Sequence, residues 1–226
     1  MSNITSLLKG FVRNSENTEK AVSVSPKGDL FMVKTMPDYS QLVAEGRVWR
    51  AQEASATASV VSLPTTAGLF TLGNNEGDDG LWYVLLACYA SNTANAVALD
   101  SYGLALNISH QPALTGGIDV SLARDIAATS IKSMLGGIGT VSPYQGKAIL
   151  DTGVTVTDDL WFPVGNASGS TAINSATGGS MWVWLNGIVV LKPKALISIV
   201  STATSTSNTT RKGFVWAEVP KSYLSI

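Results

Sequence analysis

Short runs of apolar and β-branched residues recur along most of the 226-residue chain, and Gly, Asn, Asp, Ser or Pro separates one run from the next. Runs of this length and composition are typical of β-strands, and the residues between them are typical of turns. The pattern predicts about ten strands and an all-β fold, either a β-sandwich or a jelly roll. Besides two hairpins, the expected strands are residues 42–52, 59–63, 81–91, 96–100, 104–109, 148–150, 160–163, 195–200 and 214–219.

Two hairpins are predicted from their turn residues. In residues 181–191, MWVWLNGIVVL, Asn186 and Gly187 offer the two positive-φ positions of a type I′ turn. The expected cross-strand pairs are Leu185 with Ile188, Trp184 with Val189 and Trp182 with Leu191. In residues 21–33, a turn that contains Pro and Gly separates two short apolar runs and indicates an opening hairpin.

The remaining stretches are ambiguous or connect strands. Residues 118–135 first alternate like a strand and then show apolar residues at helical spacing, and we favour a strand followed by a turn. Residues 165–179 and 201–208 are rich in small polar residues, and the second stretch is expected to lead into the last strand. Residues 1–40 are more charged and are expected to form an N-terminal arm with the opening hairpin, before a jelly-roll domain at 41–226.

The run 81–90, LWYVLLACYA, is apolar at every position. Strict alternation would place Leu81, Tyr83, Leu85, Ala87 and Tyr89 on one face and Trp82, Val84, Leu86, Cys88 and Ala90 on the other. Only one face can point into the core of the same chain, so the other face needs cover and an oligomer is expected. The candidate interface residues are Leu81, Trp82, Tyr83, Val84, Leu85, Trp182, Trp184, Phe214 and Trp216.

Composition strengthens this expectation and excludes several functions. Charged residues make up 14% of the chain and hydrophobic residues 45%, whereas an average soluble protein has about 25% charged residues. The formal net charge of -1 lacks the basic excess that nucleic-acid binding requires. The longest apolar run is far shorter than the ~20 residues that span a bilayer, and the first residues lack the apolar core of a secretory signal.

Residue types that carry catalysis or bind metals are few. His110 is the sole histidine, so a catalytic triad could form only around it, and we favour a structural role. Cys88 is the sole cysteine and is expected to be a small apolar core residue, which excludes an intrachain disulfide and a cysteine zinc site.

The expected loops also lack an intact ligand motif. Residues 139–147, GTVSPYQGK, have six residues between the glycines where a phosphate-binding loop has four. Residues 74–79, NNEGDD, offer oxygen ligands without the spacing of a calcium loop. The doublets Asp78-Asp79 and Asp158-Asp159 are expected to be solvated, because adjacent residues of an extended chain point to opposite faces. We therefore predict no enzymatic activity, no catalytic residue, no metal and no cofactor.

One resemblance covers about residues 20–220. After the opening hairpin come LVAEGRVWRAQ (42–52), TLGNNEGDDGLWYVLLACYAS (71–91), the WVWLNG hairpin, PKALISIVSTATSTS (193–207) and GFVWAEVP (213–220). In this order the segments resemble a group of tailed-phage structural proteins with a TNF-like jelly-roll fold, found as head decoration (cement) proteins or in related virion parts. The resemblance implies no catalytic residue.

The expected function is that of a non-enzymatic virion structural protein, a homotrimeric capsid decoration protein that binds the major capsid protein and stabilises the phage head. Such a protein is made in the host cytoplasm and ends on the capsid surface, without a nucleic-acid or membrane partner. The alternative is a receptor- or glycan-binding module of a phage fibre or tail, in which an exposed Trp or Tyr stacks on a sugar.

Overall fold

The computed structural model describes residues 39–65, 68, 70–94, 100–110, 118–119, 131–136, 148–151, 160–169 and 179–224. The chain divides into two compact units, Met1–Ser40 and Gln41–Ile226, and nearly all described residues belong to the second. The hairpin predicted at residues 21–33 lies outside the described residues. The elements are α2 (Ser40–Ala44), β1 (Val48–Gln52), β2 (Thr57–Ala58), β3 (Phe70–Asn74), β4 (Trp82–Ala94), β5 (Asp100–His110), β6 (Ile118–Asp119), β7 (Ile131–Ser133), β8 (Ala148–Asp151), β9 (Phe162–Gly169), β10 (Ser180–Trp184), β11 (Val190–Leu191), β12 (Ala195–Ala203), β13 (Thr209–Val219) and a 3-10 helix η1 (Lys221–Leu224).

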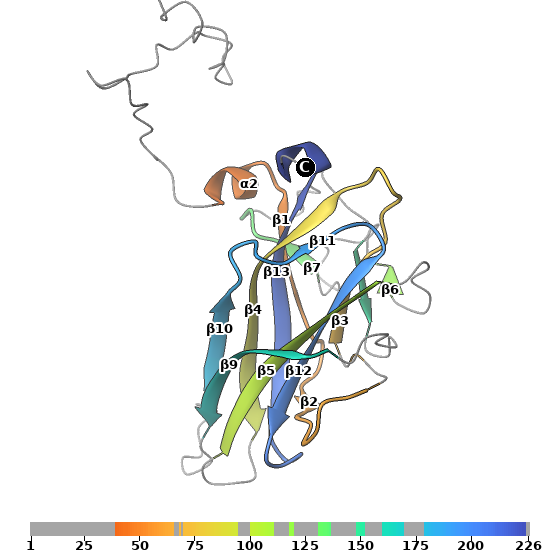
Figure 1. Ribbon diagram of the computed structural model, residues 1–226. Helices are drawn as coiled ribbons and strands as arrows, with labels where there is room; N and C mark the ends of the chain where they lie inside the picture. Colours follow the sequence, from red (N-terminus) through yellow and green to blue (C-terminus); the bar gives the residue numbers. More distant parts are fainter. Residues whose placement is uncertain are drawn as a thin grey trace, which may run out of the picture. The chain divides into compact units, whose positions relative to one another are not determined.

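Two antiparallel sheets form the second unit. One has the strand order β10-β4-β13-β1-β7, with β11 also beside β4 and β2 beside β13, and the other has the order β6-β8-β3-β12-β5-β9. Figure 1 shows strands of the second sheet, β5 and β12 among them, crossing in front of β4 and β13 of the first. The predicted all-β sandwich is confirmed at this level.

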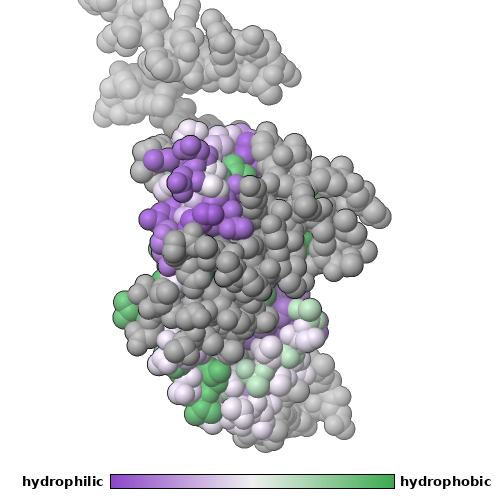
Figure 2. Space-filling view, turned by 90° about the vertical axis from the view of Figure 1, so that its right-hand side faces the viewer, coloured by the Kyte–Doolittle hydropathy of each residue, from purple (hydrophilic) through white to green (hydrophobic). Residues whose placement is uncertain are grey.

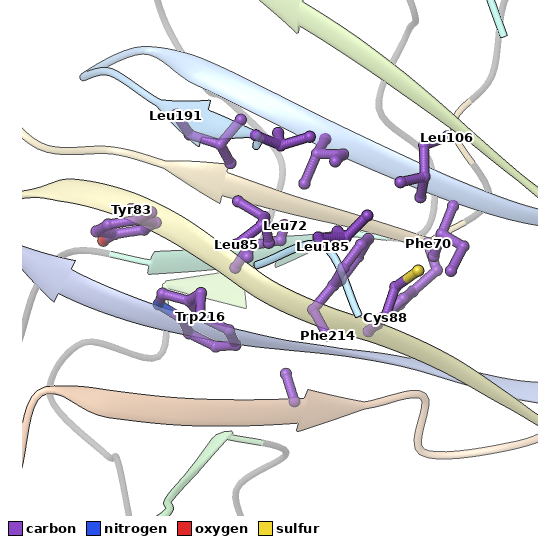
Figure 3. Packing of buried hydrophobic residues seen from close by; sticks show 14 of the residues in the cluster. Phe70, Leu72, Tyr83, Leu85, Cys88, Leu106, Leu185, Leu191, Phe214 and Trp216 are labelled. Carbon is purple, nitrogen blue, oxygen red and sulfur yellow. The ribbon is translucent and has the colours of Figure 1, made fainter. Parts of the chain in front are cut away.

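The core lies between the inner faces of the two sheets. Phe70 of β3 stacks on Phe214 of β13 with ring centroids 5.7 Å apart, and Tyr83 lies 6.3 Å from Trp216. Figure 3 shows these rings among leucines from both sheets, with the Cys88 thiol beside them. Cys88 is fully buried, which confirms its prediction as a core residue, and burial raises the pKa of its thiol to about 12. These side chains fill the inner faces, so the outward faces carry the exposed residues.

The strand predicted at residues 42–52 is wrong in its first part. Residues 40–44 form the short helix α2, and Gly46 at φ 71° ends it. The Gly46 N–H donates to the Val43 carbonyl and the Arg47 N–H donates to the Leu42 carbonyl, both at 2.9 Å. This pattern is a Schellman motif, in which a left-handed glycine satisfies the last helical carbonyls. The chain then enters β1 at Val48.

The hairpin predicted at residues 181–191 is also wrong, although its turn is present. Asn186 and Gly187 have φ angles of 48° and 80°, as a type I′ turn requires. The flanking strands β10 and β11 do not pair with each other, because each pairs antiparallel with a different part of β4. The turn is therefore a protrusion within the edge of the sheet, and the Gly187 N–H donates to the Leu85 carbonyl of β4 at 2.8 Å. Because β10 and β11 both pair with β4, the backbone groups along this edge of β4 are hydrogen-bonded. A hairpin that paired only with itself would leave them unpaired.

Other boundaries shift by smaller amounts. The strand predicted at 59–63 is reduced to a bridge between Val60 and Thr202, and β2 precedes it. The strand predicted at 160–163 begins at Phe162 and continues to Gly169, through residues expected to form a loop. Of the ambiguous stretch 118–135, the described residues form β6 and β7. Residues 201–203 extend β12, and the chain then turns into β13 as predicted.

Candidate interaction surface

Four of the nine predicted interface residues lie inside the sandwich. Tyr83, Leu85, Phe214 and Trp216 belong to the core cluster and have no exposed surface. A second copy of the chain cannot contact them while the domain is folded, so their assignment to an interface is corrected. Leu81, Trp82 and Val84 are half-buried, whereas Trp182 and Trp184 are exposed.

A β-bulge explains why simple alternation failed along β4. In the ladder between β4 and β13, Trp216 lies opposite Leu85 and Val215 lies opposite Ala87, so Leu86 is the extra residue. An extra residue reverses the inward and outward positions that follow it. Cys88 and Ala90 therefore join Tyr83 and Leu85 in the core, and Ala87 and Tyr89 lie on the outward face.

The outward face of the first sheet carries three neighbouring aromatic rings. Tyr89 of β4 lies opposite Trp182 of β10, and their rings stack with centroids 5.1 Å apart and an interplanar angle of 8°. Trp184 contacts Trp182 edge to face at 5.4 Å. Trp182 is 47% exposed and Trp184 is 61% exposed. We call Tyr89, Trp182 and Trp184 the aromatic strip.

The base of the aromatic strip is held by β1. The Tyr89 hydroxyl donates to the Ala51 carbonyl at 3.2 Å. Burial raises the pKa of Tyr89, while the charge of Arg50 and its hydrogen bond act in the opposite direction. The phenol therefore stays neutral and fixed, and the two indoles beyond it remain open to solvent. Ile188, in the protrusion after β10, is 86% exposed and adds another apolar side chain near this edge.

A hollow of about 380 Å³ lies at a different place in the sandwich, and we call it the lysine pocket. It is lined by Asp78, Trp82, His110, Lys192, Pro193 and Lys194. His110 stands at the end of β5 and is exposed, without the buried Ser or Cys partner that nucleophilic catalysis needs among the other lining residues. Asp158 and Asp159 lie outside the described residues.

Figure 2 colours one face of the molecule by hydropathy. Figure 2 shows hydrophilic residues gathered in one region of the face that it draws, while many other coloured residues range from pale to green. Within the described part of the chain, no three His, Cys, Asp or Glu residues are grouped so that they could hold a metal ion. None of the described helices has the length and apolar character to cross a membrane.

Comparison with known proteins does not add a relative to this picture. No family model, curated protein or solved structure matches the chain. A function is therefore argued from features of the described residues, here the aromatic strip and the lysine pocket.

Sequence reasoning found one of these features in part. It named Trp182 and Trp184 as candidate interface residues, but the contribution of Tyr89 depends on the bulge in β4. It missed the lysine pocket, because its lining comes from separate segments around residues 78–82, 110 and 192–194. The only local signal was the Lys-Pro-Lys sequence before β12.

Proposed function

We propose that this chain is a non-enzymatic virion structural protein, a homotrimeric jelly-roll protein that decorates a phage capsid and stabilises it. The exposed aromatic strip carries the proposal, because it gives the chain an apolar surface suited to a second copy. The resemblance described above supplies the capsid and its major protein as the partner.

Support for a TNF-like jelly roll comes from the pairing of eight strands. In chain order they are β1, β3, β4, β5, β9, β10, β12 and β13. The first pairs with the last, the second with the second-last, the third with the third-last and the fourth with the fifth. Nested pairs of this kind arise when one long antiparallel hairpin is rolled into two facing sheets, which is the jelly-roll arrangement.

Support for self-association comes from the aromatic strip. Two tryptophans about half exposed, followed in the chain by an almost fully exposed Ile188, give an apolar edge to a chain with few charges. Stable interfaces between copies bury about 800 Å² per partner and favour aromatic residues at their centre. In a ring of three copies each interface is heterologous, so the strip of one copy lies against a different surface of its neighbour and no strip is left in water.

Light scattering on the purified protein tests this proposal. We expect a trimer for the wild type and monomers for Trp184→Glu, because a carboxylate at the centre of the interface would lose its hydration without a partner. Val61→Glu is the matched control, since Val61 is 64% exposed and lies in the segment after β2. A monomeric wild type at micromolar concentration, or a trimeric Trp184→Glu, contradicts the proposal.

The alternative, a glycan-binding module of a fibre or tail, would use the same exposed indoles to stack on sugar rings. The two functions make opposite demands on the aromatic strip, because indoles buried between copies cannot bind a sugar. The neighbouring genes also discriminate: capsid, portal and protease genes favour decoration, and fibre genes favour the alternative.

A further inference from the structure

The lysine pocket lies at the start of β4, whereas the aromatic strip lies beside the middle of this strand. Trp82 begins β4 and Tyr89 lies seven residues later, a distance of roughly 23 Å along an extended strand. The pocket is open to solvent, and one chain supplies all of its lining residues. A decoration trimer does not require a pocket of this kind, so the pocket is a separate feature from the proposed function.

A buried asparagine holds the pocket walls together. Asn74, which has no exposed surface, donates its side-chain amide to the Leu81 carbonyl at 2.9 Å and to the Leu191 carbonyl at 3.0 Å. Its side-chain oxygen accepts from the Glu76 N–H at 3.1 Å, and its backbone carbonyl accepts from the Lys194 N–H at 2.8 Å. One residue therefore ties the loop before β4, the start of β4 and the loop before β12. The walls are preorganised for binding, which lowers the entropy cost of ordering them.

Lys194 is held in an unfavourable backbone conformation. Its φ angle is 68°, a left-handed conformation that costs free energy for a residue with a Cβ. A glycine would adopt this angle freely. The Ala195 N–H donates to the Lys192 carbonyl at 3.0 Å and closes the turn around it. Strain of this kind is common at ligand sites, and here it places a lysine in the wall of the pocket.

The lining residues combine three kinds of recognition. The half-buried Trp82 presents an indole, the type of surface on which the apolar face of a sugar ring packs. Lys192 and Lys194 line the pocket, the Lys194 ammonium donates to Asn75 Oδ1 at 3.4 Å, and Lys221 Nζ lies 6.0 Å from the centre of the Trp82 ring. Asp78 and His110 can accept or donate hydrogen bonds to hydroxyl groups.

From this combination we infer that the lysine pocket binds an acidic sugar, a pyranose that carries a carboxylate. The ring packs on Trp82, the carboxylate meets Lys192 and Lys194, and ring hydroxyls meet Asp78 and His110. A simple anion would leave the indole and the Asp78 carboxylate without a role, whereas a sugar brings a ring face for the first and hydroxyl donors for the second. The volume of about 380 Å³ accommodates one or two sugar units.

Calorimetric titration of the wild-type protein with D-glucuronate, its neutral counterpart methyl glucoside, and acetate tests the inference. Glucuronate is expected to bind at least fivefold more tightly than methyl glucoside, and acetate is expected not to compete at equal concentration. Added salt should weaken glucuronate binding and leave methyl glucoside binding unchanged, because salt screens exposed charges.

Three variants locate the binding. Trp82→Ala should weaken glucuronate binding about tenfold or more. Lys194→Gly should weaken it at least fivefold while the melting temperature stays equal or rises, because glycine relieves the positive φ. Lys132→Gln on β7 removes a lysine outside the pocket and should leave binding unchanged.

Equal binding of glucuronate and methyl glucoside, competition by acetate, or unchanged binding by Lys194→Gly would overturn the inference. Because all of the named lining residues belong to one chain, a wild-type protein that proves monomeric should still bind glucuronate. Failure of the trimer and failure of the sugar site are therefore distinguishable.

Discussion

A buried ion pair joins β13 to the segment after β1, and its removal gives the sharpest stability prediction. Lys212 Nζ lies 3.1 Å from Glu53 Oε2, and the two side chains are 0% and 3% exposed. Lys212 Nζ also donates to Thr57 Oγ1 at 2.6 Å, and Thr57 donates to Glu53 Oε1 at 3.0 Å. Glu53 Oε2 accepts in addition from the Lys212 backbone N–H at 2.7 Å.

Replacing Glu53 by Gln leaves the Lys212 ammonium buried without its counter-charge. Burial already lowers the pKa of Lys212, and the charge and hydrogen bond of Glu53 oppose that effect. Removing one partner of a buried pair costs about 3–5 kcal/mol of unfolding free energy. For a domain of this size, such a loss lowers the melting temperature by roughly 6–20 °C.

Urea unfolding followed by circular dichroism, at matched protein concentration, measures this loss. The control is Glu45→Gln, since Glu45 pairs with Arg47 at 2.7 Å but is 27% exposed, and it should cost on the order of 1 kcal/mol. The double variant Glu53→Leu/Lys212→Met should be more stable than Glu53→Gln, because no charge remains buried. A loss below about 1 kcal/mol for Glu53→Gln would refute the reasoning.

The pH dependence of the same variant follows from linkage. With the pKa of Lys212 lowered in the folded state, the unfolded chain binds more protons between that lowered pKa and 10.5. Stability therefore rises with pH in this window, and it should rise more steeply in Glu53→Gln. The difference in unfolding free energy between wild type and Glu53→Gln should shrink as pH approaches 10.5. Titratable groups that both proteins contain contribute equally to the two free energies and therefore cancel in this difference.

Three further outcomes are expected. Burial raises the pKa of the Cys88 thiol from 9.0 to about 12 in the folded state. The free energy of unfolding should therefore be unaffected by this thiol below pH 9 and should fall by about 1.4 kcal/mol for each pH unit above it. Urea unfolding of Cys88→Ala should not show this fall. Gly187→Val should cost about 1 kcal/mol or more, because φ is 80° and a Cβ would lie 3.1 Å from Val84, and an unchanged melting temperature contradicts this. Gly213→Ala should destabilise more strongly still in the same assay, since its Cβ would approach the Ala51 carbonyl to 2.5 Å.

Much of the fold could be predicted from residue patterns, because strand runs and breakers act locally. The strands around residues 81–91, 104–109, 195–200 and 214–219 are present, with β4, β5, β12 and β13 extending beyond them. The α2 helix was missed because its last turn depends on two hydrogen bonds that Gly46 permits, and a lone glycine between Glu45 and Arg47 does not predict them.

Pairing between distant strands was not predictable from the same patterns. The Asn186-Gly187 turn was identified correctly, yet the chain around it pairs with β4 instead of with itself. The bulge at Leu86 has no signature within LWYVLLACYA, because every residue there is apolar. The aromatic strip and the lysine pocket both depend on such long-range pairing, so only fragments of them were visible.

The bulge also weakens the argument that the apolar run 81–90 requires an oligomer. Strict alternation implied a broad apolar face in water, yet on the outward side Ala87 of β4 and Val215, Ala217 and Val219 of β13 are already buried within one chain. Most of that face therefore needs no second copy. Among the large side chains of β4 and β10, Trp182 and Trp184 remain exposed, and Ile188 in the turn after β10 is exposed as well. A charge at Tyr83 should consequently unfold the domain, whereas a charge at Trp184 should separate the copies and leave each one folded.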